Sequence, residues 1–358
     1  MAATSKTLSY NALLTTTAEA YYRAGIVQEA VFESSPTVKM LKDSGFRVEQ
    51  DGGDKIRVNL MYGKNETIDS ISAYETINTD PQDGMTVDFF DWCIYTGAIS
   101  ISEKEKAQNS GKPRIQKLLR EKTKQTTMSW AERMNRDLWD ITYAQDDSAA
   151  RTTGNSSKNI LSIPQFVQVD PTGTADPGTV DQSAEAWSQN RTKASATETT
   201  TTFKQLRQDM GNLRNTCSRG AGGAPTHYIC DQVTYEAYVN GLDEKVRYNF
   251  KDKASVGFEH VSHLGSKVFW DVDVPDAGAE SAGVAVSGSA LGSGTIYMLN
   301  DKFMDLVILA GADFKPQGFR SPHNQLASTG LYMFLGQLVS NCRRKHGVLY
   351  NIDIAIVS

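Results

Sequence analysis

Hydrophobic and polar residues alternate along two neighbouring stretches of the chain, residues 55–62 and 85–102. In the first stretch every second side chain from Ile56 to Tyr62 is apolar. The second stretch ends on the run Ile-Ser-Ile-Ser at residues 99–102. Because successive side chains of a strand point to opposite faces, the pattern predicts two half-buried strands that form a ribbon.

The ribbon has a polar tip, and nothing nearby in the sequence is available to pack on it. A two-stranded ribbon alone is at best marginally stable in water. Its second strand is nevertheless rich in large apolar side chains, namely Val87, Phe89, Trp92, Ile94, Tyr95, Ile99 and Ile101. We therefore expect the ribbon to pack on another molecule, which favours assembly over catalysis.

Residues 113–141 change to helical spacing. One stripe recurs every three or four positions and consists of Ile115, Leu119, Thr123, Thr126, Trp130, Met134, Leu138 and Ile141. At about 1.5 Å per residue, this helix would be about 43 Å long. A long helix with one moderately apolar face is typical of the central support of a flat domain.

Turn and capping residues predict the shorter elements. Ser35-Pro36 begins a helix that ends near Gly45, since proline in the first position loses no needed hydrogen bond. Asp231 is expected to cap a helix that ends near Gly241. Further expected elements are a helix from residue 203, strands at 160–169, 227–230, 267–274, 296–299 and 306–309, sheet strands within 331–357, and loops through 145–202 and 277–294.

Composition narrows the function classes. The 358 residues include 37 basic and 42 acidic ones, with a net charge of −5, whereas a dedicated nucleic-acid-binding protein needs a concentrated basic surface. The four cysteines form no CxxC pair, so they do not indicate a metal-binding or redox motif. This cysteine usage fits a reducing cytoplasm. No targeting signal is recognisable, and no apolar run reaches about 18 residues, so no membrane span is expected.

Few residues suggest chemistry. His260 and His263 could share a helix face and hold a metal, but they lack an HExxH frame, and solvated loop histidines are the favoured interpretation. Asp271, Asp273 and Asp276 resemble part of a calcium-binding loop, but the glycine and the glutamate of an EF-hand are absent. Alternation in a half-exposed strand explains the spacing of Asp271 and Asp273 without an ion. Nucleotide-binding and hydrolase motifs are absent. The sequence predicts neither enzyme activity nor a cofactor.

Residues 343–345 form a basic run that is interpreted first as a solvated turn. Inter-subunit salt bridges and a weak contact with a polyanion stay open as alternatives. The candidates for inter-subunit contacts are Tyr62, Lys64, Asn65, Glu66, Tyr74, Trp92, Arg343, Arg344 and Lys345.

Lys64, Asn65 and Glu66 raise one sharper alternative. A lysine can attack an asparagine amide beside an acidic base and form an isopeptide cross-link. Adjacent residues on a strand point to opposite faces, so another subunit would have to supply the partner. A polar turn without a cross-link is the favoured interpretation.

A long ribbon, a long helix, a loop-rich insert and a terminal sheet, in this order, resemble the major capsid proteins of tailed bacteriophages with the Hong Kong 97-type fold. The most specific likeness lies in the ribbon sequence at residues 62–86, YGKNETIDSISAYETINTDPQDGMT. Further similar segments are Trp92 with residues 100–102, and residues 225–238, 296–303 and 336–349. The resemblance covers most of the chain, because these segments occur in order between residues 62 and 349.

The resemblance implies an α+β fold with five parts. They are an extended N-terminal arm (residues 1–45), a β-hairpin E-loop (46–98), a peripheral domain with a spine helix (99–159), an axial domain (160–304) and C-terminal strands of the peripheral domain (305–358). No delta domain of about a hundred residues precedes the arm, so a separate scaffolding protein is expected.

The function implied is a major capsid protein that forms hexamers and pentamers in an icosahedral shell around double-stranded DNA. Expected partners are other copies of the chain, a scaffolding protein, a portal, a possible decoration protein and the packaged DNA, which it would contact without sequence specificity. The expected location is the virion capsid, assembled in the host cytoplasm. An encapsulin-like shell with foreign cargo is the alternative, and an enzyme site hidden within residues 160–304 is a third hypothesis.

Overall fold

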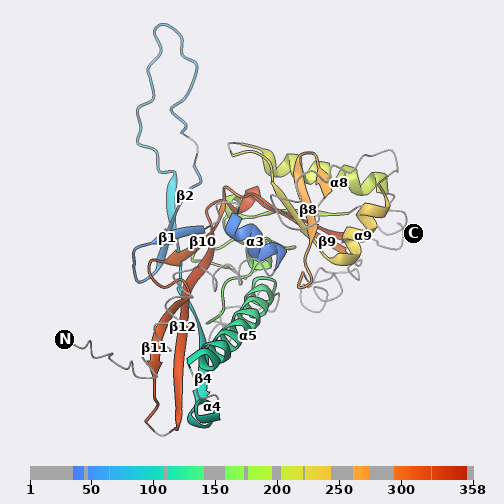
Figure 1. Cartoon of the computed structure of the whole chain (residues 1–358). Helices are drawn as coiled ribbons and strands as arrows, with labels where there is room; N and C mark the ends of the chain where they lie inside the picture. The colour runs from blue at the N-terminus through green and yellow to red at the C-terminus, as the bar shows by residue number, and fades with distance from the viewer. Residues whose placement is uncertain are drawn as a thin grey trace, which may run out of the picture.

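A computed structural model provides the structure of the chain (Figure 1). It describes residues 35–43, 47–63, 65–108, 112–140, 158–172, 176–195, 203–220, 222–242, 261–274, 294–323 and 325–352. These residues form a mixed α and β structure with two main sheets, one long helix and a projecting hairpin.

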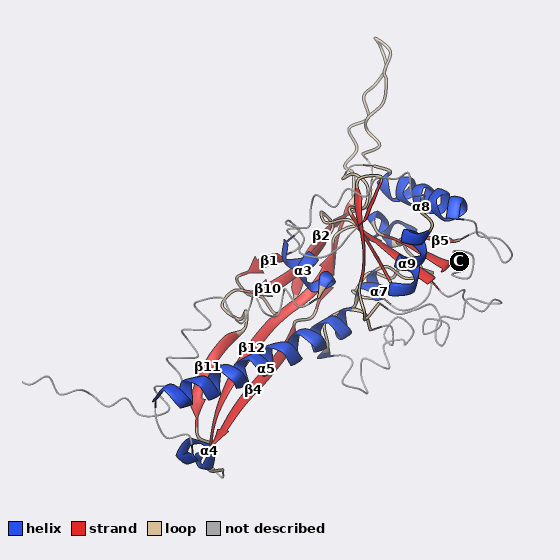
Figure 2. Cartoon of the chain, turned by 45° about the vertical axis from the view of Figure 1, so that its right-hand side comes forward, coloured by secondary structure: helices blue, strands red, loops and turns tan. Residues whose placement is uncertain are grey.

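The first sheet has five strands and supports the long helix α5 (Lys112–Leu138) along one face (Figure 2). Its central strand, β12 (Ala327–Ser340), pairs with β4 (Cys93–Ser102) over ten residues, from Ala327 opposite Ser102 to Gly336 opposite Cys93. The remaining strands are β1 (Arg47–Gln50), β10 (Met304–Leu309) and β11 (Lys315–Arg320). The short helix α4 (Glu103–Gln108) follows β4 directly.

The helix predicted over residues 113–141 is confirmed as α5, which ends at Leu138, and Ile141 lies outside the described residues. The described apolar members of its stripe are buried, namely Leu119, Trp130, Met134 and Leu138. Trp130 is only 6% exposed and meets the ring of Phe314 edge-on, with centroids 5.0 Å apart. Gly97 of β4 gives this indole its space, because an added Cβ would lie 2.8 Å from the Trp130 ring. The buried polar member of the stripe, Thr123, donates its hydroxyl to the Leu119 carbonyl and so leaves no unpaired group.

The second sheet has six strands in the order β5-β13-β9-β6-β8-β7. They are β5 (Arg191–Ala194), β6 (His227–Cys230), β7 (Val261–His263), β8 (Ser266–Trp270), β9 (Gly294–Leu299) and β13 (Gly347–Ile352). Helices α8 (Phe203–Ser218) and α9 (Gln232–Asn240) lie against it (Figure 1). As predicted, Asp231 caps α9 by accepting a hydrogen bond from the Thr234 amide.

One sequence prediction about these sheets is wrong. Residues 160–169 are not a strand but contain the buried helical turn α7 (Ile163–Phe166), in which Pro164 occupies an early position and Gln165 accepts from the Ser162 amide. The strands predicted within residues 331–357 are present as β12 and β13, in different sheets, because β13 pairs with β9 and β5, whereas β12 belongs to the five-stranded sheet.

Helix α3 (Pro36–Asp43) begins at the predicted Ser-Pro pair, and a buried carboxylate holds its first turn. Asp271 accepts hydrogen bonds from the Ser35 hydroxyl at 2.8 Å, the Thr37 hydroxyl at 2.6 Å and the Asn135 amide at 2.8 Å. The interpretation of this aspartate as part of a half-exposed strand is therefore wrong. Its carboxylate therefore links α3 to α5.

Three of the described histidines are buried, namely His227, His263 and His346. His263 is 5% exposed and its Nδ1 lies 3.1 Å from the Tyr238 hydroxyl, so the prediction of a solvated loop histidine is wrong for this residue. His260 lies outside the described residues. His346 is fully buried, and its Nδ1 accepts a hydrogen bond from the Asn300 amide.

Acid is expected to destabilise the subunit through His346. Burial lowers the pKa of this imidazole from 6.5 to about 4, because the charged form loses its hydration. The unfolded chain therefore binds a proton more readily, and the stabilisation present above pH 6.5 is lost as the pH falls toward 4, by about 3 kcal/mol at most. Unfolding measured between pH 7 and 4.5 should show this loss, with a shallower slope in His346→Gln. His323→Gln, at an exposed position, is the control, and equal slopes in all three proteins would contradict the assignment.

Candidate assembly interface

The predicted ribbon is present as a hairpin that projects from the body (Figure 1). Its strands are β2 (Ile56–Met61) and β3 (Met85–Phe90), which pair antiparallel from Ile56 opposite Phe90 to Met61 opposite Met85. The return strand is shorter than the sequence suggests. It ends at Phe90, and β4 then joins the five-stranded sheet as a separate strand.

The base of the hairpin packs on its own chain, and the expectation that the ribbon needs another molecule for this part is wrong. Ile56, Leu60 and Phe90 lie on one face and are buried. The Phe90 ring lies 5.9 Å from that of Phe166 in α7, a contact across 76 residues that local sequence does not reveal. Burial of these side chains supplies the hydrophobic stabilisation that an isolated hairpin lacks.

The strands end at a narrow neck formed by Gly63 and Gly84. The amides of Tyr62 and Gly63 both donate to the Gly84 carbonyl, at 2.9 and 3.2 Å. A Cβ added to Gly63 would lie 2.7 Å from the Gly84 Cα, so only glycine allows this close approach of the two backbones. The neck therefore separates a buried base from a tip that leaves the body.

The tip, residues 65–83, is shaped by short local turns rather than by strand pairing. The Asn65 side-chain oxygen accepts from the Thr67 amide at 2.9 Å, and the Asn78 oxygen accepts from the Asp80 amide at 2.9 Å. Such side-chain turns compete with a hydrogen-bonded ladder. Large apolar side chains of the tip face solvent in the single chain, namely Ile68, Ile71, Tyr74 and Ile77.

The charge of the tip is uniformly negative. Residues 65–83 include Glu66, Asp69, Glu75, Asp80 and Asp83 but neither lysine nor arginine. Apolar side chains on an acidic segment fit a partner surface that combines apolar contacts with neutral or basic groups. The exposed Tyr74, at full side-chain exposure, is the largest aromatic group available for such a contact.

The structure places the other ribbon candidates at different depths. Tyr62 stacks on Trp187 with ring centroids 5.0 Å apart, and it keeps 40% of its surface exposed. Trp92 is half-buried and donates its indole N–H to the Gly53 carbonyl at 2.8 Å. Glu66 is exposed next to Asn65. Lys64 lies outside the described residues, so the cross-linking alternative stays a prediction.

The basic run 343–345 is not a solvated turn. Arg343 is 4% exposed and forms an ion pair with Asp88, and Lys345 is 2% exposed and donates to the carbonyls of Arg219 and Gly220. Only Arg344 of the three is exposed. The sequence held no local signal for the ion pair, because alternation along β3 places Asp88 on the face opposite Val87 and Phe89, which is the face expected to be polar.

Three comparisons bear on the fold. A chain of the cyanophage A-1(L) capsid asymmetric unit superposes with a TM-score of 0.57, covering 88% of this chain and 92% of its own length at 12% identity. The chain has a phage-capsid fold. A chain from the capsid of an empty GTA particle gives a TM-score of 0.52 with 87% and 88% covered at 9% identity, and one from mycobacterium phage Adephagia gives 0.50 with 86% and 88% at 10%. No protein-family model and no curated protein matches the sequence.

The most prominent feature of the described structure is its projecting hairpin. Among the described residues, no group of three or more acidic, histidine or cysteine side chains is arranged to hold a metal ion. No described helix is long and apolar enough to span a membrane. The buried Cys93 and Cys217 have pKa values raised to about 12 by burial, which makes both thiols poor nucleophiles at neutral pH.

Proposed function

We propose that this chain is the major capsid protein of a tailed phage, which self-assembles into a closed shell around double-stranded DNA. The observation that carries the proposal is the hairpin of the phage-capsid fold, whose tip exposes three isoleucines and a tyrosine beyond the glycine neck. Exposed apolar groups gathered in this way mark a surface that contacts a neighbouring molecule.

The finer parts of the proposal follow the family resemblance. The hairpin corresponds to the E-loop, α5 to the spine helix and the six-stranded sheet to the axial domain. Copies would form hexamers and pentamers, and each tip would reach a neighbouring copy. A contact in which one surface of a subunit meets a different surface of the next closes into rings, which fits such capsomers.

The proposed partners are other copies of the chain, a separate scaffolding protein, a portal and a possible decoration protein. Contact with packaged DNA would be non-specific, as the net charge of −5 suits a wall that encloses DNA without gripping it. The proposed location is the virion capsid after assembly in the host cytoplasm. No catalytic role is proposed.

Electron microscopy of the purified chain, expressed with and without a neighbouring scaffold gene, tests the proposal. Closed shells are the expected result, and a compact monomer under every condition would overturn it. The contents of the particles distinguish a phage capsid from the encapsulin-like alternative. Nuclease-protected double-stranded DNA in particles from infected cells supports the phage capsid, whereas a co-purifying protein cargo without DNA supports the alternative.

Shells of this protein are expected to be noncovalent. Many modest contacts per subunit act together, so strength does not require a covalent bond. Denaturing electrophoresis of mature particles under reducing conditions should give one band near 39.3 kDa. A ladder of multiples that vanishes in Lys64→Ala but persists in Lys55→Ala would show that Lys64 is a nucleophile.

A further inference from the structure

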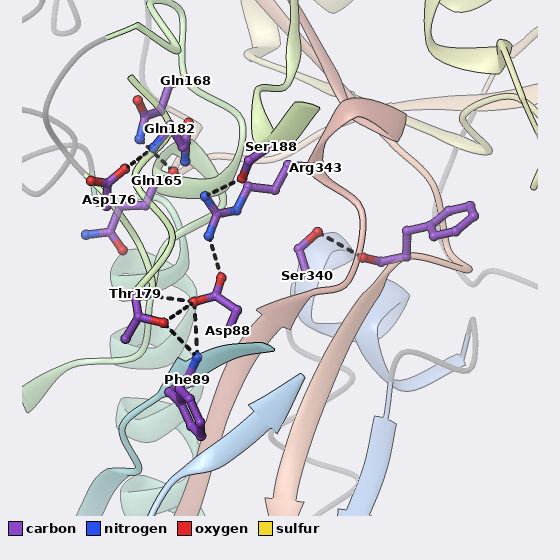
Figure 3. Close-up of polar contacts among 11 residues, drawn as sticks. Asp88, Phe89, Gln165, Gln168, Asp176, Thr179, Gln182, Ser188, Ser340 and Arg343 are labelled. Atoms are coloured by element: carbon purple, nitrogen blue, oxygen red, sulfur yellow. Dashed lines mark hydrogen bonds and ion pairs between the residues drawn. The ribbon is translucent and has the colours of Figure 1, made fainter. Parts of the chain in front are cut away.

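A buried ion pair joins the hairpin to the body (Figure 3). Asp88 of β3 accepts from the Arg343 guanidinium, with Oδ2 and Nη2 2.8 Å apart, and the two side chains are 0% and 3% exposed. Burial lowers the pKa of Arg343, and the charges of Asp88 and Asp176 partly offset that effect. The arginine is therefore held by nearby carboxylates rather than by water.

The second oxygen of the Asp88 carboxylate is fully used as well. Oδ1 accepts from the Thr179 amide at 2.7 Å, the Thr179 hydroxyl at 3.0 Å and the Phe89 amide at 3.1 Å. Arg343 also donates to the Ser188 hydroxyl at 3.3 Å. Gly178 packs so closely on the carboxylate that a Cβ there would collide with it. The position of the Asp88 carboxylate is thus fixed by its hydrogen bonds and by close packing.

The groups around this carboxylate come from three separate parts of the chain. Asp88 belongs to the hairpin, Thr179 and Ser188 to the loop of residues 176–190, and Arg343 to the 3-10 turn η4 (Arg343–Lys345). This turn connects β12 of the five-stranded sheet to β13 of the six-stranded sheet. The ion pair therefore lies where the hairpin meets the connection between the two sheets.

Such a pair is poorly explained as a source of stability. The cost of removing two charges from water can exceed their attraction, and apolar replacements of both partners are often neutral or stabilising. The pair instead fixes the orientation of the two side chains, because a guanidinium donates hydrogen bonds in a fixed plane and four groups donate to the carboxylate. We propose that Asp88 and Arg343 form a joint that fixes the angle at which the hairpin leaves the body. On the proposed function, this angle sets the curvature of the shell.

Hydrogen exchange on the full-length chain tests the joint independently of assembly. In Asp88→Leu combined with Arg343→Met, the two charges of the pair are removed together and neither is left buried without the other, so the body should stay folded. Amides of β2 and β3 should nevertheless exchange about tenfold faster or more, while β9 and β10 keep their protection. Unchanged exchange in the hairpin, or equal loss throughout the chain, would overturn the joint. Asp88→Asn, which leaves Arg343 unpaired, should lower the unfolding temperature more than the double variant does.

Particle shape tests the consequence for assembly. The double variant should form open sheets or shells of altered diameter, and shells identical to those of the wild type would overturn the role in curvature. Lys55→Ala is the matched control, since Lys55 and Asp91 form an exposed ion pair at 3.0 Å beside the same hairpin. The same defects in this control would also overturn the proposal. If the wild-type chain forms no particles, the proposed function fails, while the exchange result still decides the joint.

Discussion

Replacing residues 63–84 by the dipeptide Asn-Gly is expected to leave a folded, soluble subunit that forms no closed shells. The cut lies beyond the cross-strand pair Met61 and Met85, so Tyr62 with the new dipeptide makes a three-residue hairpin loop. The buried base, Ile56, Leu60 and Phe90, stays intact. The variant should keep the thermal unfolding transition of the wild type, and electron microscopy should show no shells.

A second variant separates tip chemistry from tip length. It carries Ile68→Ser, Ile71→Ser, Tyr74→Ser and Ile77→Ser, and it retains all 358 residues. We expect the same loss of shells, because the lost contribution is the burial of apolar surface against a neighbour. Normal shells from either variant would show that the tip is dispensable. A collapsed unfolding transition after the deletion would show that the tip packs on its own subunit.

Trp130→Ala is expected to lower the free energy of unfolding by roughly 3 to 5 kcal/mol. The indole fills the space between the long helix and the sheet, edge-on to Phe314 and directly above Gly97. Since neither a glycine nor a packed ring can move into the vacated volume, a cavity should remain and add to the lost burial.

Urea unfolding of the unassembled subunit measures this effect. Met128→Ala, on the same helix but 62% exposed, is the matched control and should stay within about 0.5 kcal/mol of the wild type. A Trp130→Ala protein that is as stable as this control would show that the packing of the helix on the sheet is assigned to the wrong face.

Residues that sequence reasoning located correctly share a local signal. Trp130 belongs to a stripe at helical spacing, and Asp231 precedes its helix as a cap should. The strand at residues 227–230 and the hairpin strand β2 follow from a short apolar run and from alternation, respectively. Tyr74 and Asn65 are exposed, as expected of a polar tip between two strands, and their contacts with another subunit stay a prediction.

The spacing of apolar residues predicts the secondary structure and the buried face of each segment, but it does not show which distant segment packs against that face. The amino-acid sequence determined the long helix, the hairpin, the caps and the acidic, apolar tip, because spacings of two and 3.6 residues record which face is buried. Only the tertiary structure decided that β13 leaves the sheet of β12 and that Arg343 is buried against Asp88. The two charged residues are 255 positions apart, and a basic run looks the same in sequence whether water or a carboxylate receives it.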